Sequence, residues 1–377
     1  MKKMVALTAV LTAMCLLISC NYSNQTETPT ASLQSAADSS NATEQGVILD
    51  EIEGVSDPAD YQFAVVYGGD HPFFYPWASG AKAAAQDLGI PEPYIASPQA
   101  WDQTEQNQVI DSMIDKGAKG IAMFPSDATA GNLQITKLAI DGIPCVTMGG
   151  SPMEPSDAVF CYATDVGASV ALGTQELINK LKANGLKQGN IVHLCSSLAD
   201  TNTRKRQEAI KEVLSRPENA GFQLYMELSD TDAIEPAEKA ISTMFSTYIS
   251  EVDGIICTGY VNAQVLAKTM VKLNETRVVA IGIDDSQDVL TAIDQRIMYG
   301  TMTQNPWGMG YVGIYALKLI KDGYRYKANK PFLIDSGYFL LTKDGLSTYQ
   351  QTIESNTKEF VSMMQDEYFE KPRESFE

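Results

Sequence analysis

Aromatic and acidic side chains follow short apolar runs in this chain. His71–Phe74 comes just after Phe63–Tyr67, and Asp284 comes just after Val278–Gly282. A carboxylate accepts hydroxyl protons, a guanidinium donates a fixed fork of N–H groups, and an aromatic ring covers a weakly apolar face. Side chains of these kinds suit a ligand rich in hydroxyl groups, provided that the fold brings them together.

Positioning these residues requires regular elements, and the chain supplies them from about Tyr61 onward. Short β-rich runs alternate with longer amphipathic stretches, several of which end at a glycine, as Trp77–Leu88 does at Gly89. Such patterns are typical of buried strands and of helices with a left-handed C-terminal cap. The expected helices are 77–88, 106–116, 131–141, 168–183, 204–214, 235–248, 263–273 and 307–322, and the expected strands are 63–67, 120–124, 143–148, 190–195, 223–228, 254–257, 278–282 and 299–303.

Alternating βα units of this length predict parallel sheets that are covered by helices on both faces. In such sheets the ligand contacts come from the loops that follow the carboxyl ends of the strands. The loops to search are therefore Gly68–Phe74, Pro125–Asp127, Ser196–Thr203, Thr258–Asn262 and Asp284–Asp285.

The first twenty residues have the pattern of an export signal. Lys2 and Lys3 precede the apolar run Met4–Ile18, which is too short to span a bilayer with flanks of its own. Because Cys20 follows the small Ser19, the segment resembles a bacterial lipoprotein signal, in which that cysteine is lipidated. An ordinary signal peptide with an incidental cysteine is the alternative. We expect a signal peptide over 1–19 and an extracytoplasmic protein, in the periplasm or at the cell surface, anchored to the membrane by lipid.

Composition after Cys20 indicates a tether followed by an acidic body. Residues 21–46 contain few large apolar side chains, so they cannot bury enough surface to offset the cost of ordering, and we expect a disordered tether over 20–58. Without Lys2 and Lys3 the chain has 26 basic and 47 acidic residues, a formal charge of −21. This balance argues against a nucleic-acid partner, whose phosphates require a basic surface.

Cysteine and histidine usage gives no sign of a metal centre. Each body cysteine lies in or beside a short apolar run, where we expect it to be a small buried side chain, although a disulfide stays open. No C-x-x-C spacing occurs, and His71 and His193 are the two histidines of the chain. We therefore expect no metal and no cofactor. The body cysteines are Cys145, Cys161, Cys195 and Cys257.

Four segments together resemble a known family. They read VVYGGDHPFFYPWASGAKAAAQDLG, KGAKGIAMFPSDATAGNLQITKLAIDGIPCVTM, AIGIDDSQDVLTAI and GTMTQNPWGMGYVGIYALKLIKDG. In order and spacing they are similar to the ribose- and galactose-type periplasmic sugar-binding proteins of ABC importers. The resemblance extends from about Tyr61 to Lys343.

This resemblance implies an α/β fold of the periplasmic-binding-protein type I, with two doubly wound parallel-sheet lobes joined by a three-crossover hinge. The N-terminal lobe is expected over 59–150 and 302–330, and the C-terminal lobe over 151–301 and 331–377. The chain should cross between them near Gly149–Asp165, Thr301–Gln304 and Asn329–Asp335.

The resemblance also implies a set of ligand contacts. The family's Asn-Pro-Phe-Phe becomes His71–Phe74 here, so the aromatic pair is kept and a histidine replaces a hydrogen-bonding asparagine. Arg206 corresponds to the ligand arginine although Ala209 and Ile210 replace the usual glycine and phenylalanine. The implied contacts are His71, Phe73, Phe74, Trp101, Asp102, Asp127, Arg206, Asn262, Asp284 and Gln304, with Trp307 as an alternative ring cover.

Several of these residues have structural alternatives. Phe73 and Phe74 could be core residues at the start of a helix. Asp127 and Asp284 could be helix N-caps. Arg206 could be a solvated helix residue beside other basic side chains.

The function implied by the resemblance is capture of a monosaccharide or similar polyol and its delivery to an ABC import permease by a monomeric protein. A sensor subunit that presents the ligand to a membrane kinase or chemoreceptor is the alternative. We do not expect an enzyme, because no G-x-S-x-G, HExxH, G-x-G-x-x-G or P-loop string occurs, but Asp102 and Asp127 stay open as a carboxylate pair. A DNA-binding regulator is excluded because an exported chain without a basic head cannot reach DNA.

Overall fold

Short apolar runs form the strands of a first parallel sheet, to which residues from both ends of the described chain contribute. The computed structural model describes residues 57–198 and 200–371. The strand order is β12-β5-β4-β3-β1-β2, and every pairing is parallel. The strands are β1 (Ala64–Val66), β2 (Tyr94–Ala96), β3 (Ile121–Met123), β4 (Cys145–Met148), β5 (Cys161–Ala163) and β12 (Leu333–Asp335).

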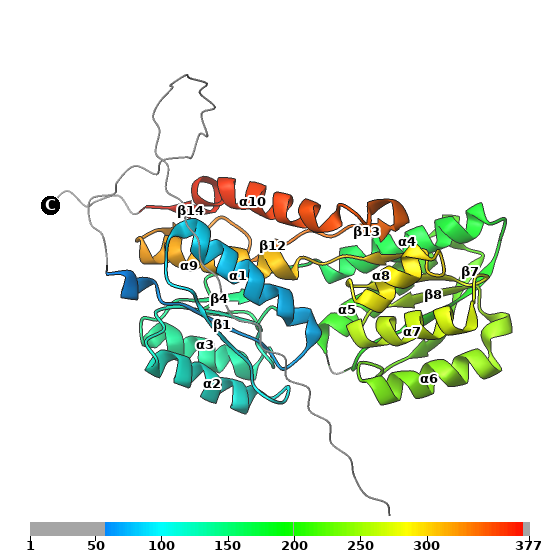
Figure 1. The fold of residues 1–377 in the computed structure, drawn as a ribbon, viewed down its shortest axis with the longest axis horizontal. Helices are drawn as coiled ribbons and strands as arrows, with labels where there is room; N and C mark the ends of the chain where they lie inside the picture. The colour runs from blue at the N-terminus through cyan, green and yellow to red at the C-terminus, as the bar shows by residue number, and fades with distance from the viewer. Residues whose placement is uncertain (1–56, 199, 372–377) are drawn as a thin grey trace, which may run out of the picture. The chain divides into compact units, whose positions relative to one another are not determined.

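Four helices cover the two faces of this sheet. Figure 1 shows α1 in blue, α2 and α3 in cyan, and α9 in orange. On one face α1 (Tyr75–Leu88) packs against α9 (Pro306–Lys321), and on the other lie α2 (Gln103–Asp115) and α3 (Ala130–Ile140). The backbones of α1 and α9 touch: a Cβ added at Gly80 would lie 1.9 Å from the carbonyl oxygen of Trp307. This close approach joins α9 firmly to the first lobe, although the second lobe separates α1 and α9 in the sequence.

A second sheet has the order β13-β10-β9-β8-β6-β7, in which β13 is antiparallel and the other pairings are parallel. Apolar side chains of α4 and α5 pack on one face, and those of α6, α7 and α8 pack on the other. The strands are β6 (Gly189–Leu194), β7 (Phe222–Leu228), β8 (Gly254–Cys257), β9 (Val279–Ile283), β10 (Gly300–Met302) and β13 (Leu340–Thr342). The helices are α4 (Val166–Ala183), α5 (Thr201–Ser215), α6 (Ile234–Thr247), α7 (Tyr260–Leu273) and α8 (Gln287–Asp294).

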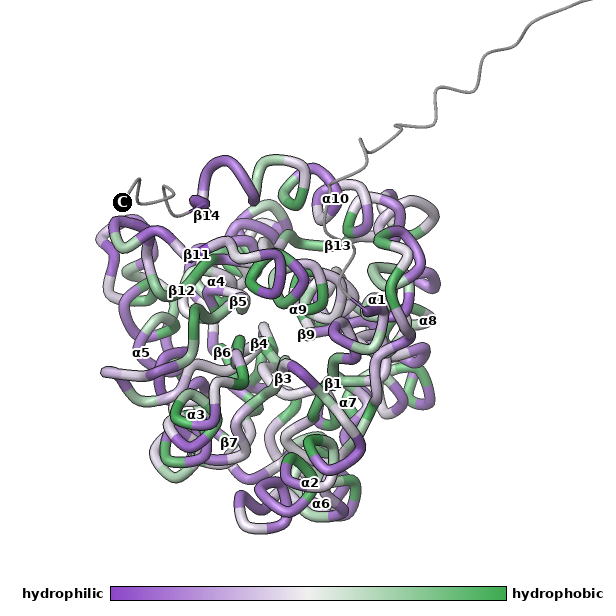
Figure 2. The backbone as a smooth tube through the Cα atoms, turned by 90° about the vertical axis from the view of Figure 1, so that its left-hand side faces the viewer, coloured by the Kyte–Doolittle hydropathy of each residue, from purple (hydrophilic) through white to green (hydrophobic). Residues whose placement is uncertain are grey.

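Amphipathic patterning explains these layers. Figure 2 shows hydrophilic and hydrophobic residues alternating along outer helices such as α2, α5 and α6, as expected for helices with one face on a sheet and one in solvent. The remaining short elements are the 3₁₀ helices η1 (Pro58–Tyr61), η2 (Pro72–Phe74), η3 (Pro217–Asn219), η4 (Ile249–Glu251) and η5 (Lys343–Gly345), and the strand pair β11 (Arg325–Tyr326) and β14 (Phe369–Glu370).

Within the described residues, four connections join the lobes. They run from β5 to α4, from β10 to α9, from β12 to β13 and from β13 into α10. Asn305 ties them together: its Nδ2 donates to Ser336 O at 3.2 Å and to Tyr162 Oη at 3.4 Å, and its Oδ1 accepts from Gly308 N at 2.7 Å at the start of α9.

After β13 the chain returns to the first lobe in the long helix α10 (Tyr349–Tyr368). Its second half buries Val361 and Met364 in the first lobe's core, and Thr357 Oγ1 accepts from Asn305 Nδ2 at 2.9 Å. Just before the helix, Leu346 packs against the core of the second lobe, and at the helix start Tyr349 Oη donates to Asp285 Oδ2 at 3.0 Å. Helix α10 therefore contacts both lobes.

The expected two-lobe parallel α/β fold is confirmed, and the expected helices and strands lie within about three residues of the observed ones. The lobe limits differ from those expected. Strand β5 and strand β12 lie in ranges assigned to the C-terminal lobe, yet they pair with each other and complete the first sheet. The first crossing therefore follows Ala163, and the last crossing between strands follows Asp335. The expected signal and Cys20 lie outside the described residues. Among the helices that the structure describes, none is long and apolar enough to span a membrane.

Candidate functional site

A cavity of about 530 Å³ is lined by residues of both lobes. Phe73 and Tyr75 contribute from η2 and α1, Tyr260 from the start of α7, and Trp307 from α9. Four further polar contributors follow β9 and β10, at the carboxyl ends of these strands of the second sheet. They are Asp284, Asp285, Thr303 and Gln304.

Asp284 is held in this cavity by its backbone and by its side chain. It follows β9 in a left-handed conformation, φ 62°, and two bonds fix its backbone: Asp284 N donates to Met302 O at 2.9 Å, and Thr301 Oγ1 donates to Asp284 O at 2.7 Å. Its Oδ1 accepts from Gln304 Nε2 at 2.8 Å. Strain held at such a position by neighbouring hydrogen bonds is common at functional sites.

Burial raises the pKa of Asp284 to about 7. The Gln304 hydrogen bond and the Arg206 charge oppose this increase, whereas the charges of Asp285 and Asp232 add to it. A carboxyl that is only partly ionised near neutrality accepts hydroxyl protons better once it is charged. Asp284 is therefore suited to bind a hydroxyl-rich ligand and to titrate as it does so.

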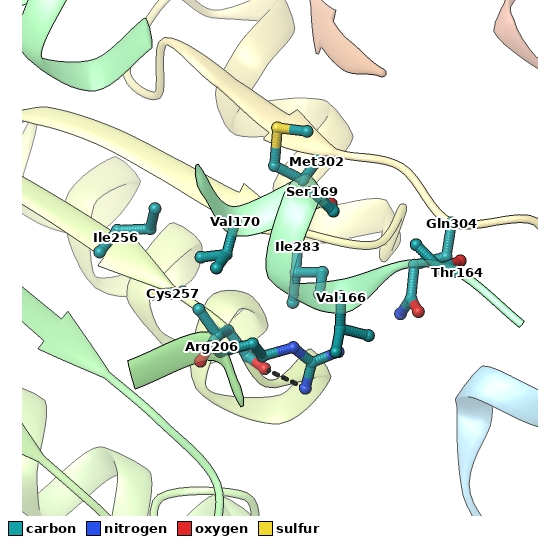
Figure 3. Close-up of a pocket in the computed structure, with 11 residues that line it drawn as sticks. Thr164, Val166, Ser169, Val170, Arg206, Ile256, Cys257, Ile283, Met302 and Gln304 are labelled. Carbon is teal, nitrogen blue, oxygen red and sulfur yellow. Dashed lines mark hydrogen bonds between the residues drawn. The ribbon is translucent and has the colours of Figure 1, made fainter. Parts of the chain in front are cut away.

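Arg206 lies next to a small cavity of about 10 Å³ that also touches Gln304 (Figure 3). Asp200 caps α5 by accepting from the amides of Asn202 and Thr203 at 3.1 and 3.0 Å. From this helix Arg206 Nη1 donates to Thr258 O at 3.1 Å. The alternative of a solvated arginine is wrong, because Arg206 is only 8% exposed. Burial lowers the pKa of its guanidinium, against the opposing charges of neighbouring aspartates.

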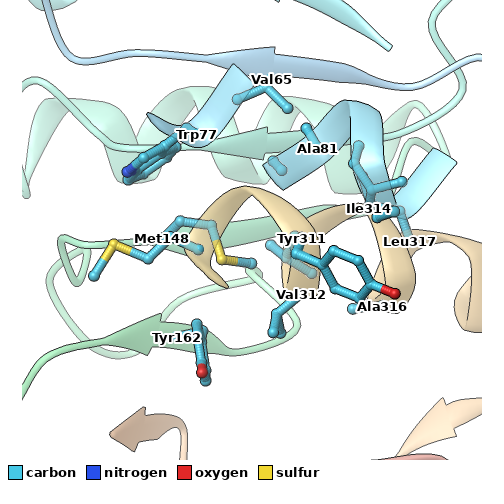
Figure 4. Close-up of a cluster of buried hydrophobic side chains, with 14 of the residues drawn as sticks. Val65, Trp77, Ala81, Met148, Tyr162, Tyr311, Val312, Ile314, Ala316 and Leu317 are labelled. Atoms are coloured by element: carbon cyan, nitrogen blue, oxygen red, sulfur yellow. The ribbon is translucent and has the colours of Figure 1, made fainter. Parts of the chain in front are cut away.

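The two phenylalanines of η2 have different surroundings. Phe74 is fully buried and stacks on Tyr67 with ring centroids 5.1 Å apart, as part of the apolar cluster whose Trp77 and Tyr311 are labelled in Figure 4. Phe73 is half-buried and lines the cavity. The structure thus places one ring in the core and brings the other to the cavity.

His71 caps η2 and also faces the second lobe. Its Nδ1 accepts from Phe73 N at 3.2 Å, so the ring proton resides on Nε2 in the neutral form. Nε2 is buried without a hydrogen-bond partner among the described residues, and the ring centroid is 5.7 Å from that of Tyr260. Burial lowers the pKa of His71, while Asp232 and Asp70 oppose this. His71 therefore offers a neutral donor between the lobes.

His71 and the remaining first-lobe candidates do not line the cavity. Trp101 is 52% exposed, and its Nε1 donates to Ser126 O at 2.9 Å. Asp102 caps α2 by accepting from Glu105 N at 2.9 Å. Exposed Asp127 accepts from two amides at the start of α3, those of Thr129 and Ala130 at 2.8 and 2.7 Å. Asp127 thus fixes the turn that leads into α3, whose N-cap residue is Thr129. Asp284 is not an N-cap either, since Ser286 caps α8.

Asn262 is fully buried at the start of α7. Its Oδ1 accepts from Gly259 N at 3.2 Å, and its Nδ2 donates to Thr231 Oγ1 at 3.0 Å. Both ends of this amide therefore stabilise the loop before α7.

Sequence reasoning did not select Tyr260, Asp285 or the α10 residues that line the cavity. Tyr260 and Asp285 lie in loops that the parallel-sheet argument had already marked, so the position after a strand was the available signal. Helix α10 carried no such signal, because its place at the cavity depends on the last crossing between lobes.

A second polar group lies inside the second lobe. His193 on β6 and Glu227 on β7 are paired in register, and with Cys195 they place three possible ligand atoms within 4.8 Å of one another. His193 Nδ1 is 2.9 Å from Glu227 Oε2, and Nε2 is 2.8 Å from Thr258 Oγ1. Both ring nitrogens are therefore engaged by protein groups, in a hydrogen-bonded network. Sequence reasoning missed the group because Glu227 is remote in sequence.

The four described cysteines are buried, as expected, and free. Burial raises the pKa of each thiol, so none has the character of a reactive thiolate.

Comparisons with known proteins agree on one family. Residues 63–325 match the model of the family described as periplasmic binding protein domain. The D-allose-binding periplasmic protein of Escherichia coli is 24% identical over 266 residues, which cover 67% of this chain and 80% of that protein. The D-apiose import binding protein of Paraburkholderia graminis is 25% identical over 235 residues, 62% of this chain and 72% of that protein.

Solved structures show the same fold. An ABC transporter solute-binding protein from Burkholderia graminis, in complex with D-arabinose, superposes with a TM-score of 0.68 at 22% identity and covers 78% of this chain and 99% of its own.

Proposed function

Since the chain belongs to the periplasmic binding protein domain family, we propose that it binds a monosaccharide or related polyol in the cavity between its lobes and delivers it to an ABC import permease. The observation that carries this proposal is the cavity itself. The ring of Phe73, from the first lobe, shares it with the hydrogen-bonded pair Asp284 and Gln304. The names of the relatives, which refer to allose and apiose, support the same class of ligand.

Different residues would make the polar and the apolar contacts with the ligand. Asp284 accepts two hydroxyl protons, and Gln304 orients that carboxylate and offers its own amide oxygen. Phe73 and Trp307 cover the apolar faces of the ring. His71 donates from Nε2, and Arg206 supports the charge of Asp284.

We retain Phe74, Trp101, Asp102, Asp127 and Asn262 as further proposed contacts. The last four follow carboxyl ends of strands β2, β3 and β8, which is where parallel sheets present ligand contacts. Their present hydrogen bonds to helix starts and loops would have to be shared with the ligand.

Closure of the lobes follows from this division. Hinge closure around a ligand is known for periplasmic binding proteins. Since contacts come from both lobes, the ligand binds the closed state more strongly than the open one, and that difference in affinity drives closure. Hydrogen bonds to charged groups contribute about 1.5–3 kcal/mol each, so four to six of them suffice for micromolar affinity, which needs about 8 kcal/mol.

Calorimetry and small-angle scattering test the proposal. We expect the purified protein to bind at least one member of a panel of aldopentoses, aldohexoses and pentitols, and to become more compact on binding. Binding without compaction would contradict closure, and no binding to any member of the panel would contradict the proposed ligand class.

We also propose that the protein is a monomeric lipoprotein, anchored outside the cytoplasm through Cys20, and that it is not an enzyme. The family's periplasmic members and the export pattern of residues 1–20 support the location. The names of its relatives, which are binding proteins, support the absence of turnover.

A further inference from the structure

Helix α10 lies outside the part of the chain that matches the family model. That match ends at residue 325, whereas α10 covers Tyr349–Tyr368. The helix is nevertheless an integral part of the fold, because Val361 and Met364 are buried in the first lobe's core and Thr357 bonds to Asn305 in the hinge.

The first turns of α10 form one wall of the cavity. Tyr349, Gln350, Ile353 and Glu354 line it, at the spacing that places residues on one side of a helix. Tyr349 Oη donates to Asp285 Oδ2 at 3.0 Å, and Gln350 Nε2 donates to Tyr349 Oη at 3.2 Å. These two bonds fix the start of α10 against the loop that follows β9.

Glu354 differs from Tyr349 and Gln350 in its hydrogen bonding. Its carboxylate is exposed, and it makes no hydrogen bond or ion pair with any residue that the structure describes. Gln350 uses its Nε2 on Tyr349 and leaves its amide oxygen available. An unpaired carboxylate and an amide oxygen at the wall of a cavity are both acceptors.

The cavity as a whole is also lined by acceptors rather than by cationic side chains. Its described lining includes the carboxylates of Asp284, Asp285 and Glu354, and it includes no lysine, arginine or histidine. The Arg206 guanidinium, which does not line the cavity, acts on the charge of Asp284 and leaves Asp285 and Glu354 without a cationic partner among the described residues. Aromatic rings supply much of the remaining surface, among them Tyr260 and Trp307. Carboxylates repel an acidic ligand, and both carboxylates and aromatic faces attract a cation.

We propose that α10 is a specificity element of the binding site, in which Gln350 and Glu354 contact the ligand and select a polyol that carries a protonated amino group over its neutral and acidic counterparts. This inference rests on the proposed function, since it concerns the ligand of the same cavity. It assigns ligand contacts to a segment beyond the family match, where the resemblance gave none.

Calorimetry with two matched series of sugars tests the inference. The probes are glucosamine, glucose and glucuronate, and galactosamine, galactose and galacturonate, each measured with wild-type protein and with Glu354→Gln, Gln350→Ala and Glu359→Gln. Glu359 is exposed on the same helix but does not line the cavity, so its variant is the matched control for a lost carboxylate.

In at least one series we expect wild-type affinity to fall from the amino sugar through the neutral sugar to the acid, by about tenfold between the first and the last. Glu354→Gln should reduce that ratio at least threefold, Gln350→Ala should weaken binding of all three sugars, and Glu359→Gln should leave the ratio unchanged. Circular dichroism melting curves would establish that the variants fold.

Two results would overturn the inference while the proposed function survives. One is an affinity ratio that Glu354→Gln leaves unchanged. The other is a wild-type protein that prefers the acidic or the neutral sugar in both series, or that binds pentoses or pentitols and none of these six sugars. If wild-type protein binds none of these sugars and none of the pentoses and pentitols, the proposed function itself fails, and the inference fails with it.

Discussion

Replacing Asp284 with asparagine isolates the charge of this group with little change of shape. The residue has a φ of 62°, a conformation that asparagine adopts more readily than most residues, whereas alanine would add backbone strain. Asparagine also keeps a side-chain oxygen that can accept from Gln304 Nε2. A change in binding therefore reports on ionisation rather than on a collapsed loop.

The pKa of about 7 sets the expected magnitude. Ligand hydroxyls that donate to Asp284 favour its charged form, so binding should lower this pKa and release a proton. The carboxyl is ionised to roughly one tenth at pH 6 and to roughly nine tenths at pH 8, which predicts about a tenfold gain in affinity between these values. Asp284→Asn should show no such gain and should bind more weakly at pH 8.

The unfolding free energy should fall as the pH rises, whereas the ligand affinity rises. Because the folded pKa lies above the ordinary value of 3.8, the folded state holds this proton more tightly than the unfolded state does. The corresponding stability is fully present below about pH 4 and is lost as the pH rises through 7. At most about 4 kcal/mol of the unfolding free energy is involved, and Asp284→Asn should remove that part of the pH dependence.

Calorimetry at pH 6, 7 and 8, in buffers of different ionisation enthalpy, measures both the affinity and the number of protons released. Asp115→Asn is a suitable control, because Asp115 is exposed near the end of α2 and does not line the cavity. A wild-type affinity that is constant from pH 6 to 8, or a pH dependence that persists in Asp284→Asn, would refute the reasoning.

Three further outcomes are expected. His193→Ala should lower the unfolding free energy by about 2–4 kcal/mol, because it removes one hydrogen-bond partner from buried Thr258 and one from the Glu227 carboxylate; an unchanged urea midpoint would contradict this. Asn305→Ala should cost about 2–3 kcal/mol and weaken ligand-induced compaction in scattering, since this amide joins the hinge connections. Cys20→Ala should move the protein from the membrane fraction to the soluble fraction with unchanged ligand affinity, and retention in the membrane fraction would argue against lipidation.

Local patterns predicted most of the regular structure. Helices that end at Gly89, Gly117 and Gly323 do so because each glycine has a positive φ, which ends the helix at little cost. Strands such as β1 and β8 are buried on both faces and therefore appear in sequence as continuous apolar runs. Periodicity and glycine placement were sufficient for these elements.

Lobe membership could not be predicted in the same way. Strands β5 and β12 are short, and nothing in the sequence of either strand indicates which of the two sheets it joins. Their place in the first sheet depends on the pairing of Leu333–Asp335 with Cys161–Ala163 across the whole second lobe. Long-range pairing of this kind leaves no local signal.

The site was predictable to the level of loops, but not of side chains. Asp102 and Asp127 follow strands, as ligand aspartates do, yet each also lies at the start of a helix and accepts from free amides there. Phe73 and Phe74 are adjacent and alike, and packing against Tyr67, Trp77 and Phe124 buries Phe74 fully. Residue type and spacing cannot separate these roles, because capping, packing and binding favour the same residues.

Helix α10 couples the ligand site to the hinge through two unequal attachments. Its second half is held by apolar burial in the first lobe, whereas its start is held by the hydrogen bond from Tyr349 to Asp285 of the second lobe. Asp285 is adjacent to Asp284, so a ligand that engages Asp284 acts on the loop to which α10 is bonded. In the proposed closure the second lobe moves relative to the first. The buried second half of α10 then remains with the first lobe. The hydrogen bond from Tyr349 to Asp285 must rearrange, or the start of α10 must move with the loop that follows β9. The wall that Gln350 and Glu354 provide is then set by the same movement that brings the lobes together, which explains how a helix outside the family match can contribute to both ligand selection and closure.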